Sequence, residues 1–182
     1  MTSPTAVSVF GSSQTVPGSP EWIEALEVGS RLASQNVAVV TGGYGGTMEA
    51  VSKGAAEAGG HVVGVTAPEL FTTRASANPY VIETIEATTL TGRIGVMMDR
   101  SEGAIALAGS IGTAAELLIL WNTNHILRRT GATPLPCAAV GDGWKDVATS
   151  LVENIGAGTG DVHHVDTGDE AVSWILGQIE IL

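Results

Sequence analysis

Basic residues, cysteines and aromatic residues are all scarce in this chain of 182 residues. Only eight side chains are Lys or Arg, against 19 that are Asp or Glu, so the net charge at pH 7 is −11. Proteins that bind duplex DNA or RNA carry a basic patch or stripe, and a nucleic-acid polymer is therefore a poor candidate for a partner. A small anion is still a possible ligand, provided that local donors hold it.

Cys137 is the single cysteine, and it lies within the apolar run at 135–140. A disulfide within the chain is therefore impossible, and no Cys/His cluster has the spacing of zinc ligands. We expect neither a metal nor another cofactor. Because no signal peptide or bilayer-length apolar run is visible, we also expect a cytoplasmic protein without a membrane attachment.

Apolar residues are plentiful, at 44% of the chain, whereas charged residues make up 15%. Such a composition can bury a large core, so disorder is not expected. The length suits one domain, which we take as residues 1–182. The low charged fraction is also consistent with a surface that a second subunit partly covers.

Short apolar segments alternate with helix-period segments along the chain, and a loop is expected at 67–80. This alternation indicates βαβ units and predicts an α/β fold, a single Rossmann-like doubly wound domain with a mainly parallel sheet flanked by helices. The strands are predicted at 7–10, 37–40, 61–65, 81–85, 103–107, 137–140 and 162–165, and the helices from residue 20, from the 42–46 turn to 58, and at 90–100, 113–127, 144–155 and 169–179.

Three turns rich in glycine and small residues follow predicted strands, at 11–13, 41–47 and 107–113. Glycine lets the backbone approach a ligand, and a helix start offers free N–H groups to an anion. Ligands of doubly wound sheets bind at the carboxyl ends of the strands, so the turns predict a site for a small phosphate-bearing ligand. The alternative is that the glycines serve only tight turns. The candidate ligand-binding residues are Gly11, Ser12, Gly42, Gly43, Gly45, Gly46, Gly109, Ser110, Gly112 and Thr113.

Two better-known phosphate motifs do not fit these turns. A Walker loop ends in Gly-Lys-Ser/Thr, and no lysine follows a glycine-rich turn here. The dinucleotide-binding motif needs Gly-x-Gly-x-x-Gly after the first strand. Gly43 and Gly45 begin such a pattern, but Met48 takes the third glycine's place and the turn follows the second strand. NAD is therefore a weak candidate.

Glu116 lies one helical turn after Gly112, and two interpretations of it remain open. Its carboxylate can return toward a ligand in the turn, where it would stabilise a positive sugar or activate water. Alternatively, Thr113-x-x-Glu116 is a capping box that closes a helix start. The same spacing recurs at Thr167-x-x-Glu170, where no glycine-rich turn precedes it.

Arg93 and Arg100 lie seven residues apart, so one helical face can present both of them. With so few basic residues in the chain, either is a candidate to clamp a phosphate with two hydrogen bonds. The alternative for both is a solvated or ion-paired arginine.

These motifs together resemble the LOG (LONELY GUY) family of cytokinin-type nucleotide phosphoribohydrolases. Residues 41–48 are similar to the family's GGGxxGxM motif, with Thr41 in the first glycine's place. Residues 108–116 are similar to its PGGxGTxxE motif, with Ala108 for proline and Ser110 for the second glycine. Arg93 has the spacing of the family's arginine. The resemblance runs from residue 9 through the helix after Glu116.

The resemblance implies hydrolysis of a nucleoside 5′-monophosphate to free base and ribose 5-phosphate, with Arg93 and Glu116 as the catalytic pair. It also implies that Gly109, Gly112 and Thr113 hold the phosphate, and that the protein is a homodimer. Related Rossmann-like proteins bind nucleotides or carry molybdenum cofactor without hydrolysis, and the departures at 108 and 110 keep that alternative open. Family members are often labelled lysine decarboxylases, but the two lysines of this chain lie in predicted helices away from the turns.

Overall fold

One sheet of seven strands runs through the computed structural model, which describes residues 5–72, 76–158 and 160–179. All of its pairings are parallel, in the order β4-β3-β2-β1-β5-β6-β7. The chain begins in the middle, winds to one edge and then returns past β1 to build the other half. The strands are β1 (Ala6–Phe10), β2 (Ala38–Thr41), β3 (Val62–Thr66), β4 (Glu83–Glu86), β5 (Gly103–Ala106), β6 (Cys137–Val140) and β7 (His163–Val165).

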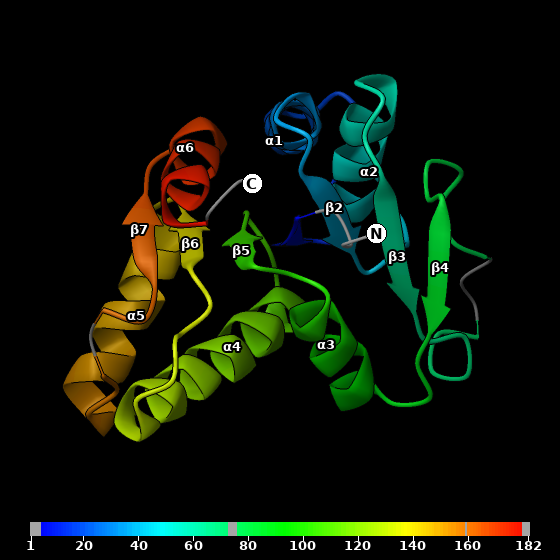
Figure 1. Ribbon diagram of the computed structural model, residues 1–182. Coiled ribbons are helices and arrows are strands. Elements are labelled where there is room, and N and C mark those ends of the chain that lie inside the picture. Colours follow the sequence, from blue (N-terminus) through cyan, green and yellow to red (C-terminus); the bar gives the residue numbers. More distant parts are fainter. Residues whose placement is uncertain (1–4, 73–75, 159, 180–182) are drawn as a thin grey trace.

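Helices cover both faces of the sheet, so that the molecule has three layers (Figure 1). One face is covered by α1, α2 and α6, and the other by α3, α4 and α5. The predicted fold class is therefore confirmed. The helices are α1 (Pro20–Ser34), α2 (Thr47–Glu57), α3 (Leu90–Asp99), α4 (Ile111–Thr130), α5 (Asp142–Ile155) and α6 (Gly168–Gln178).

The core lies on both sides of the sheet because successive strand residues point to opposite faces. In β1, Val7 and Val9 pack under α1, α2 and α6, whereas Phe10 packs under α3, α4 and α5. The side chains of β5 alternate in the same way, and Ile105 packs under α1, α2 and α6. Central strands buried on both faces explain why the sequence shows continuous apolar runs instead of alternation.

Two helix starts follow directly from their sequences. Ser19 caps α1 by accepting a hydrogen bond from the Trp22 backbone N–H, and Pro20 occupies the first helical position. Thr167 and Glu170 form a complete capping box at the start of α6. Both ends were expected from the residue types that helix N-termini prefer.

Several element boundaries coincide with the predicted ones, and the others differ by one to three residues. The largest difference is in α4, which begins two residues before Thr113 and continues to Thr130. It ends where Gly131 adopts a left-handed conformation, with φ of 77°. Residues 67–72 and 76–82 contain neither helix nor strand, as predicted for the 67–80 loop, while residues 73–75 lie outside the described part.

Two glycines allow α1 and α2 to pack with their backbones in contact. A Cβ atom on Gly54 would lie 1.9 Å from the carbonyl oxygen of Leu26, and one on Gly29 would lie 2.1 Å from that of Val51. We expect Gly54→Ala and Gly29→Ala each to lower the free energy of unfolding by about 2 kcal/mol, although alanine favours helices by about 1 kcal/mol. Urea unfolding measures the change.

The matched control is Gly95→Ala in the middle of α3, where an added Cβ would meet nothing within 4 Å. There the better helix propensity is unopposed, so we expect a gain of up to about 1 kcal/mol. Equal stability of the Gly54→Ala and Gly95→Ala variants would contradict the close packing of α1 and α2.

Candidate active site

The three glycine-rich turns meet at one edge of the sheet, where backbone hydrogen bonds join them. The Ser12 N–H donates to the Ala108 carbonyl at 3.2 Å, and the Thr47 N–H donates to the Ser12 carbonyl at 2.8 Å. This connection is possible because β1 lies between β2 and β5, so that its turn lies between theirs. The prediction that the turns share one edge is confirmed.

Gly11 and Gly46 are the points at which two of these turns pack closely. A Cβ atom on Gly11 would lie 2.3 Å from the Thr47 side chain, and one on Gly46 would lie 2.4 Å from the Ser12 carbonyl oxygen. Gly46 also has a φ of 71°, which L-residues rarely adopt. The packing alone thus requires both glycines, and their contact with a ligand stays a prediction.

Arg93 extends from α3 to the end of β3 and is 4% exposed. Its Nε donates to the Val65 carbonyl at 2.7 Å, and its Nη1 lies 3.2 Å from Oε1 of Glu116. Gly42 provides the necessary space, because a Cβ atom there would lie 1.5 Å from Nη2. The guanidinium carbon also lies 6.0 Å from the centre of the Tyr44 ring, within the range of a cation–π contact.

Glu116 and Arg93 form a buried ion pair, in which the Glu116 side chain keeps 11% of its exposure. Desolvation by burial raises the pKa of Glu116 to about 6, although the charge of Arg93 and its hydrogen bond act to lower it. A carboxylate that titrates near neutral pH can both accept and return a proton. The pair therefore has the chemistry of a general acid or base.

The capping-box interpretation of Glu116 is wrong. The N-cap of α4 is Ser110, so Thr113 and Glu116 lie inside the helix and cannot close its start. The contrast with Thr167 and Glu170, which do form a capping box, shows that one four-residue pattern serves two purposes in this chain. Glu116 differs from Glu170 because it pairs with Arg93, and the sequence spacing alone does not place Arg93 beside Glu116.

The Thr113 hydroxyl is buried without a hydrogen-bond partner among the described residues. It lies directly under the 109–113 turn, since a Cβ atom on Gly109 would come within 2.3 Å of it. An unpaired buried hydroxyl costs about 1–3 kcal/mol, so such groups in a folded protein call for an explanation. A ligand in the turn would supply the missing partner.

The rest of that turn faces solvent. Ser110 and Gly112 are exposed, and Ile111 keeps 86% of its exposure. Ser110 has φ of −123° and ψ of −163°, an extended conformation open to any residue. Serine in the place of the family's second glycine therefore strains nothing, and the turn keeps its N–H groups at the positive end of the long helix α4.

The 41–47 turn forms one wall of a hollow of about 450 Å³, which Gly45, Glu49 and Gln14 line. Gly43 is held in place by its carbonyl, which accepts hydrogen bonds from the backbone and side-chain nitrogens of Asn78. Asn78 was predicted only as a loop residue, because an asparagine before a proline is typical of a loop.

Tyr44 belongs to the same wall and is 5% exposed. Its hydroxyl accepts a hydrogen bond from the Ala67 N–H at 2.9 Å, and its ring meets Phe71 edge to face. A smaller hollow of about 300 Å³ is lined by Ser12 and Gly109. Gln14 lines both hollows, so the two hollows adjoin each other beside the glycine-rich turns.

Trp144 is a further residue that sequence reasoning missed. Its Nε1 donates to the Leu107 carbonyl at 2.9 Å in a buried contact. Leu107 is the residue at which β5 leads into the 109–113 turn, so the first turn of α5 supports this turn from below. The sequence carries no signal for this hydrogen bond, because the Leu107 carbonyl and the Trp144 side chain become neighbours only when the chain folds.

Arg100 is not part of the candidate active site. It lies at the surface, away from Arg93, and pairs with Glu83 at 2.6 Å.

No cluster of three potential metal ligands occurs in the described part of the chain. Among the described residues, no helix combines the length and the apolar character of a membrane span. Burial raises the pKa of the Cys137 thiol to about 12, so this cysteine is not a nucleophile at neutral pH.

The fold and the joined turns define a Rossmann-like α/β protein with three glycine-rich turns at one edge of the sheet and a buried carboxylate–arginine pair. The family model described as the SLOG cluster4 family matches residues 4–171, and the chain belongs to that family. This match confirms the resemblance that the two glycine motifs indicated.

Two named relatives match part of the chain. A cytokinin riboside 5′-monophosphate phosphoribohydrolase from Mycobacterium marinum is 36% identical over 112 residues, which are 60% of this chain and 59% of that protein. A pyrimidine/purine nucleotide 5′-monophosphate nucleosidase from Escherichia coli K12 is 33% identical over 109 residues, which are 55% of this chain and 23% of that protein. The chain therefore spans only part of the length of each.

A solved structure extends the likeness over the whole fold. The molybdenum cofactor binding protein from the phototrophic bacterium Rippkaea orientalis matches with a TM-score of 0.76 and 21% identity, over 99% of this chain and 100% of that chain. At this level of identity the match shows the shared fold.

The raised pKa of Glu116 predicts a pH-dependent cost of folding. Between about pH 4.5 and 6 the folded protein binds more protons than the unfolded chain, so the wild type loses stability as the pH rises through this window. Glu116→Gln cannot titrate. Relative to this variant, we expect the wild type to lose about 2 kcal/mol of unfolding free energy between pH 4 and 7. Parallel denaturant curves for both would contradict the assignment.

Proposed function

We propose that the protein hydrolyses the N-glycosidic bond of a nucleoside 5′-monophosphate, of the AMP or cytokinin ribotide type, to give free base and ribose 5-phosphate. The observation that carries this proposal is the buried Arg93–Glu116 pair, set one helical turn behind a solvent-facing turn suited to a phosphate. The names of the Mycobacterium marinum and Escherichia coli relatives support the same reaction class.

The 5′-phosphate is assigned to the 109–113 turn. Its backbone N–H groups and the positive end of α4 favour an anion, and Gly109 and Gly112 let the phosphate approach closely. A small shift of the turn at Gly109 would expose the Thr113 hydroxyl, which then gains a phosphate oxygen as its partner. Ser12 and Ser110 extend the same seat, and the net charge of −11 makes these local donors necessary.

In the proposed reaction the Glu116 carboxylate takes a proton from water as the water oxygen bonds to the anomeric carbon. The bond from that carbon to the base nitrogen breaks, and its electron pair leaves with the base, which takes up the proton that Glu116 accepted from water. The same carboxylate stabilises the positive charge that develops on the sugar. Arg93 orients Glu116 through the ion pair, since its own Nε is held by Val65.

The 41–47 turn contributes the wall of the 450 Å³ hollow, in which we place the base and ribose. Gly45 and Glu49 face that hollow directly. Tyr44 supports the wall through its bond to Ala67. A homodimer and a cytoplasmic location, which the family resemblance and the composition suggested, remain part of this proposal.

A second candidate function is ligand binding without turnover, as in a cofactor carrier. The observation in its favour is the full-length match to a molybdenum cofactor binding protein, together with Ala108 where the family has proline. The Arg93–Glu116 pair favours hydrolysis, because a carrier does not need a carboxylate that titrates near neutral pH.

The decisive experiment measures base release from AMP by Glu116→Gln. We expect kcat to fall at least a hundredfold, because the amide can neither accept the proton nor stabilise the positive sugar. In the wild type, kcat/KM should decrease as the pH falls below about 6, where Glu116 becomes protonated. Liquid chromatography of the released base gives both quantities.

Glu170→Gln is the matched control, since it follows a threonine at the same spacing but closes α6 and lies far along the chain from the turns. Its turnover should equal that of the wild type. Tight binding of AMP without any base release by the wild type would favour the carrier, and equal turnover of the two glutamine variants would refute the role of Glu116.

Thr113→Val tests the phosphate seat separately from the chemistry. The substitution keeps the shape and removes a buried hydroxyl that lacks a partner, so we expect stability to stay equal or to rise by about 1 kcal/mol. At the same time KM for AMP should rise about tenfold, as expected for the loss of one hydrogen bond to a charged group.

The control for this variant is Thr47→Val, whose hydroxyl is already bonded to that of Thr15 at 2.8 Å. This change should lower stability because it breaks an existing bond. An unchanged KM in Thr113→Val would show that the phosphate does not use this hydroxyl.

A further inference from the structure

A separate hollow of about 280 Å³ lies between α4, α5 and β7, at the opposite end of the sheet from β4. Its floor is apolar and is made by Trp121, Ala148, Val152 and Val162. None of the residues in the proposed active site lines it. The volume is close to the lower end of the range for small-molecule sites, so the hollow fits a ligand of about one or two rings.

Two polar side chains line this hollow without partners of their own. Lys145 extends from the first turns of α5 and forms no ion pair with any described carboxylate. His164 comes from β7, and its Nδ1 is enclosed with no hydrogen-bond partner among the residues that the structure describes. A buried N–H without an acceptor costs more than a lone pair left alone, so the ring proton belongs on Nε2.

His164 therefore offers the hollow one N–H donor, next to the ammonium group of Lys145. Burial lowers the pKa of His164, and the charges of His163 and Lys145 lower it further, so the ring is neutral at pH 7. One neutral donor and one cation match the two oxygens of a carboxylate. Glu153 also lines the hollow and disfavours a group with more negative charge, such as a phosphate.

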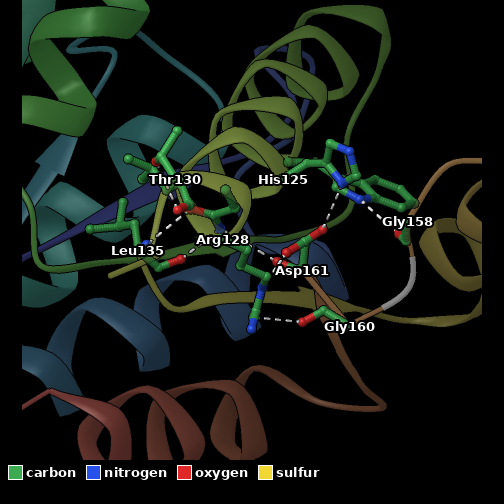
Figure 2. Close-up of polar contacts among 10 residues, drawn as sticks. His125, Arg128, Thr130, Leu135, Gly158, Gly160 and Asp161 are labelled. Atoms are coloured by element: carbon green, nitrogen blue, oxygen red, sulfur yellow. Dashed lines mark hydrogen bonds and ion pairs between the residues drawn. The ribbon is translucent and has the colours of Figure 1, made fainter. Parts of the chain in front are cut away.

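The walls of the hollow are held by a cluster of polar contacts between α4 and residues 158, 160 and 161, shown in Figure 2. Asp161 is 5% exposed, forms an ion pair with Arg128, and has one carboxylate oxygen 3.9 Å from Nδ1 of His125. Arg128 also donates to the Gly160 carbonyl at 2.9 Å, and Trp121 donates through Nε1 to the Gly158 carbonyl at 3.1 Å.

This cluster holds the Trp121 indole and the Gly160 backbone, both of which line the hollow, in place before any ligand arrives. A site built from side chains that are already fixed loses little conformational entropy on binding. The combination of an apolar floor, walls held by hydrogen bonds and two donors that have no partner among the described residues is what a ligand site requires.

We propose that this hollow is a second binding site, which takes a small planar compound with a carboxylate that Lys145 and the Nε2–H of His164 bind. The ring of the compound would lie on Trp121 and Val162. The proposal does not depend on the proposed hydrolase function, since the two sites share no residue.

Benzoate is the probe, and uncharged benzamide of the same shape is its control. In a ¹H–¹³C NMR titration we expect benzoate to shift the ring resonances of His164. His163 serves as an internal reference because it stacks on Trp174, at a centroid distance of 4.3 Å, on the other face of the sheet. Benzamide should bind at least fivefold more weakly. Equal affinities, or a shift of His163 alone, would overturn the proposal.

Two exposed substitutions then locate the site without disturbing the core. Lys145→Met removes the cation, and Thr149→Trp fills the rim of the hollow, so each should weaken benzoate binding at least fivefold. The control is Lys53→Met, because Lys53 pairs with Glu57 on α2, on the opposite face. If Lys145→Met binds benzoate as tightly as Lys53→Met, with both proteins folded by circular dichroism, the proposed site does not exist.

Discussion

The buried charge of Arg93 is the constraint on which the arrangement of the candidate active site depends. An unpaired guanidinium in a protein interior costs several kcal/mol, so the surrounding chain has to satisfy it. Glu116 supplies the opposite charge, Val65 supplies a carbonyl, and Gly42 leaves out the side chain that would occupy the same space. One arginine thereby connects α3, α4, β3 and the turn after β2.

The ion pair also links stability to the proposed chemistry. Burial that makes Glu116 costly to ionise is the same burial that brings its pKa near neutrality. The 109–113 turn shows a related tension, since Thr113 keeps a buried hydroxyl unpaired next to a turn that faces solvent. Both features lower the stability of the free protein, and the proposed function gives each of them a use.

Much of the fold was predictable because local patterns carry it. Each predicted strand and helix is present, and helix starts such as Ser19 and Thr167 were recognised from the cap residues themselves. The alternative that the structure rules out was also local: Thr113-x-x-Glu116 has the spacing of a capping box, but α4 starts at Ile111, and Glu116 pairs with an arginine 23 residues away. Spacing rules describe neighbours along the chain, and this partner is a neighbour only in space.

The sequence by itself determined the alternation of strands and helices, the glycine-rich turns and the family to which they point, because these depend on composition and short-range periodicity. Only the tertiary structure decided how the three turns contact one another. The place of β1 between β2 and β5 lets Ser12 join the other two turns, and burial raises the pKa of Glu116 and leaves Nδ1 of His164 without a partner among the described residues. Burial and strand order are properties of the whole chain, so they become visible only when the packing is known.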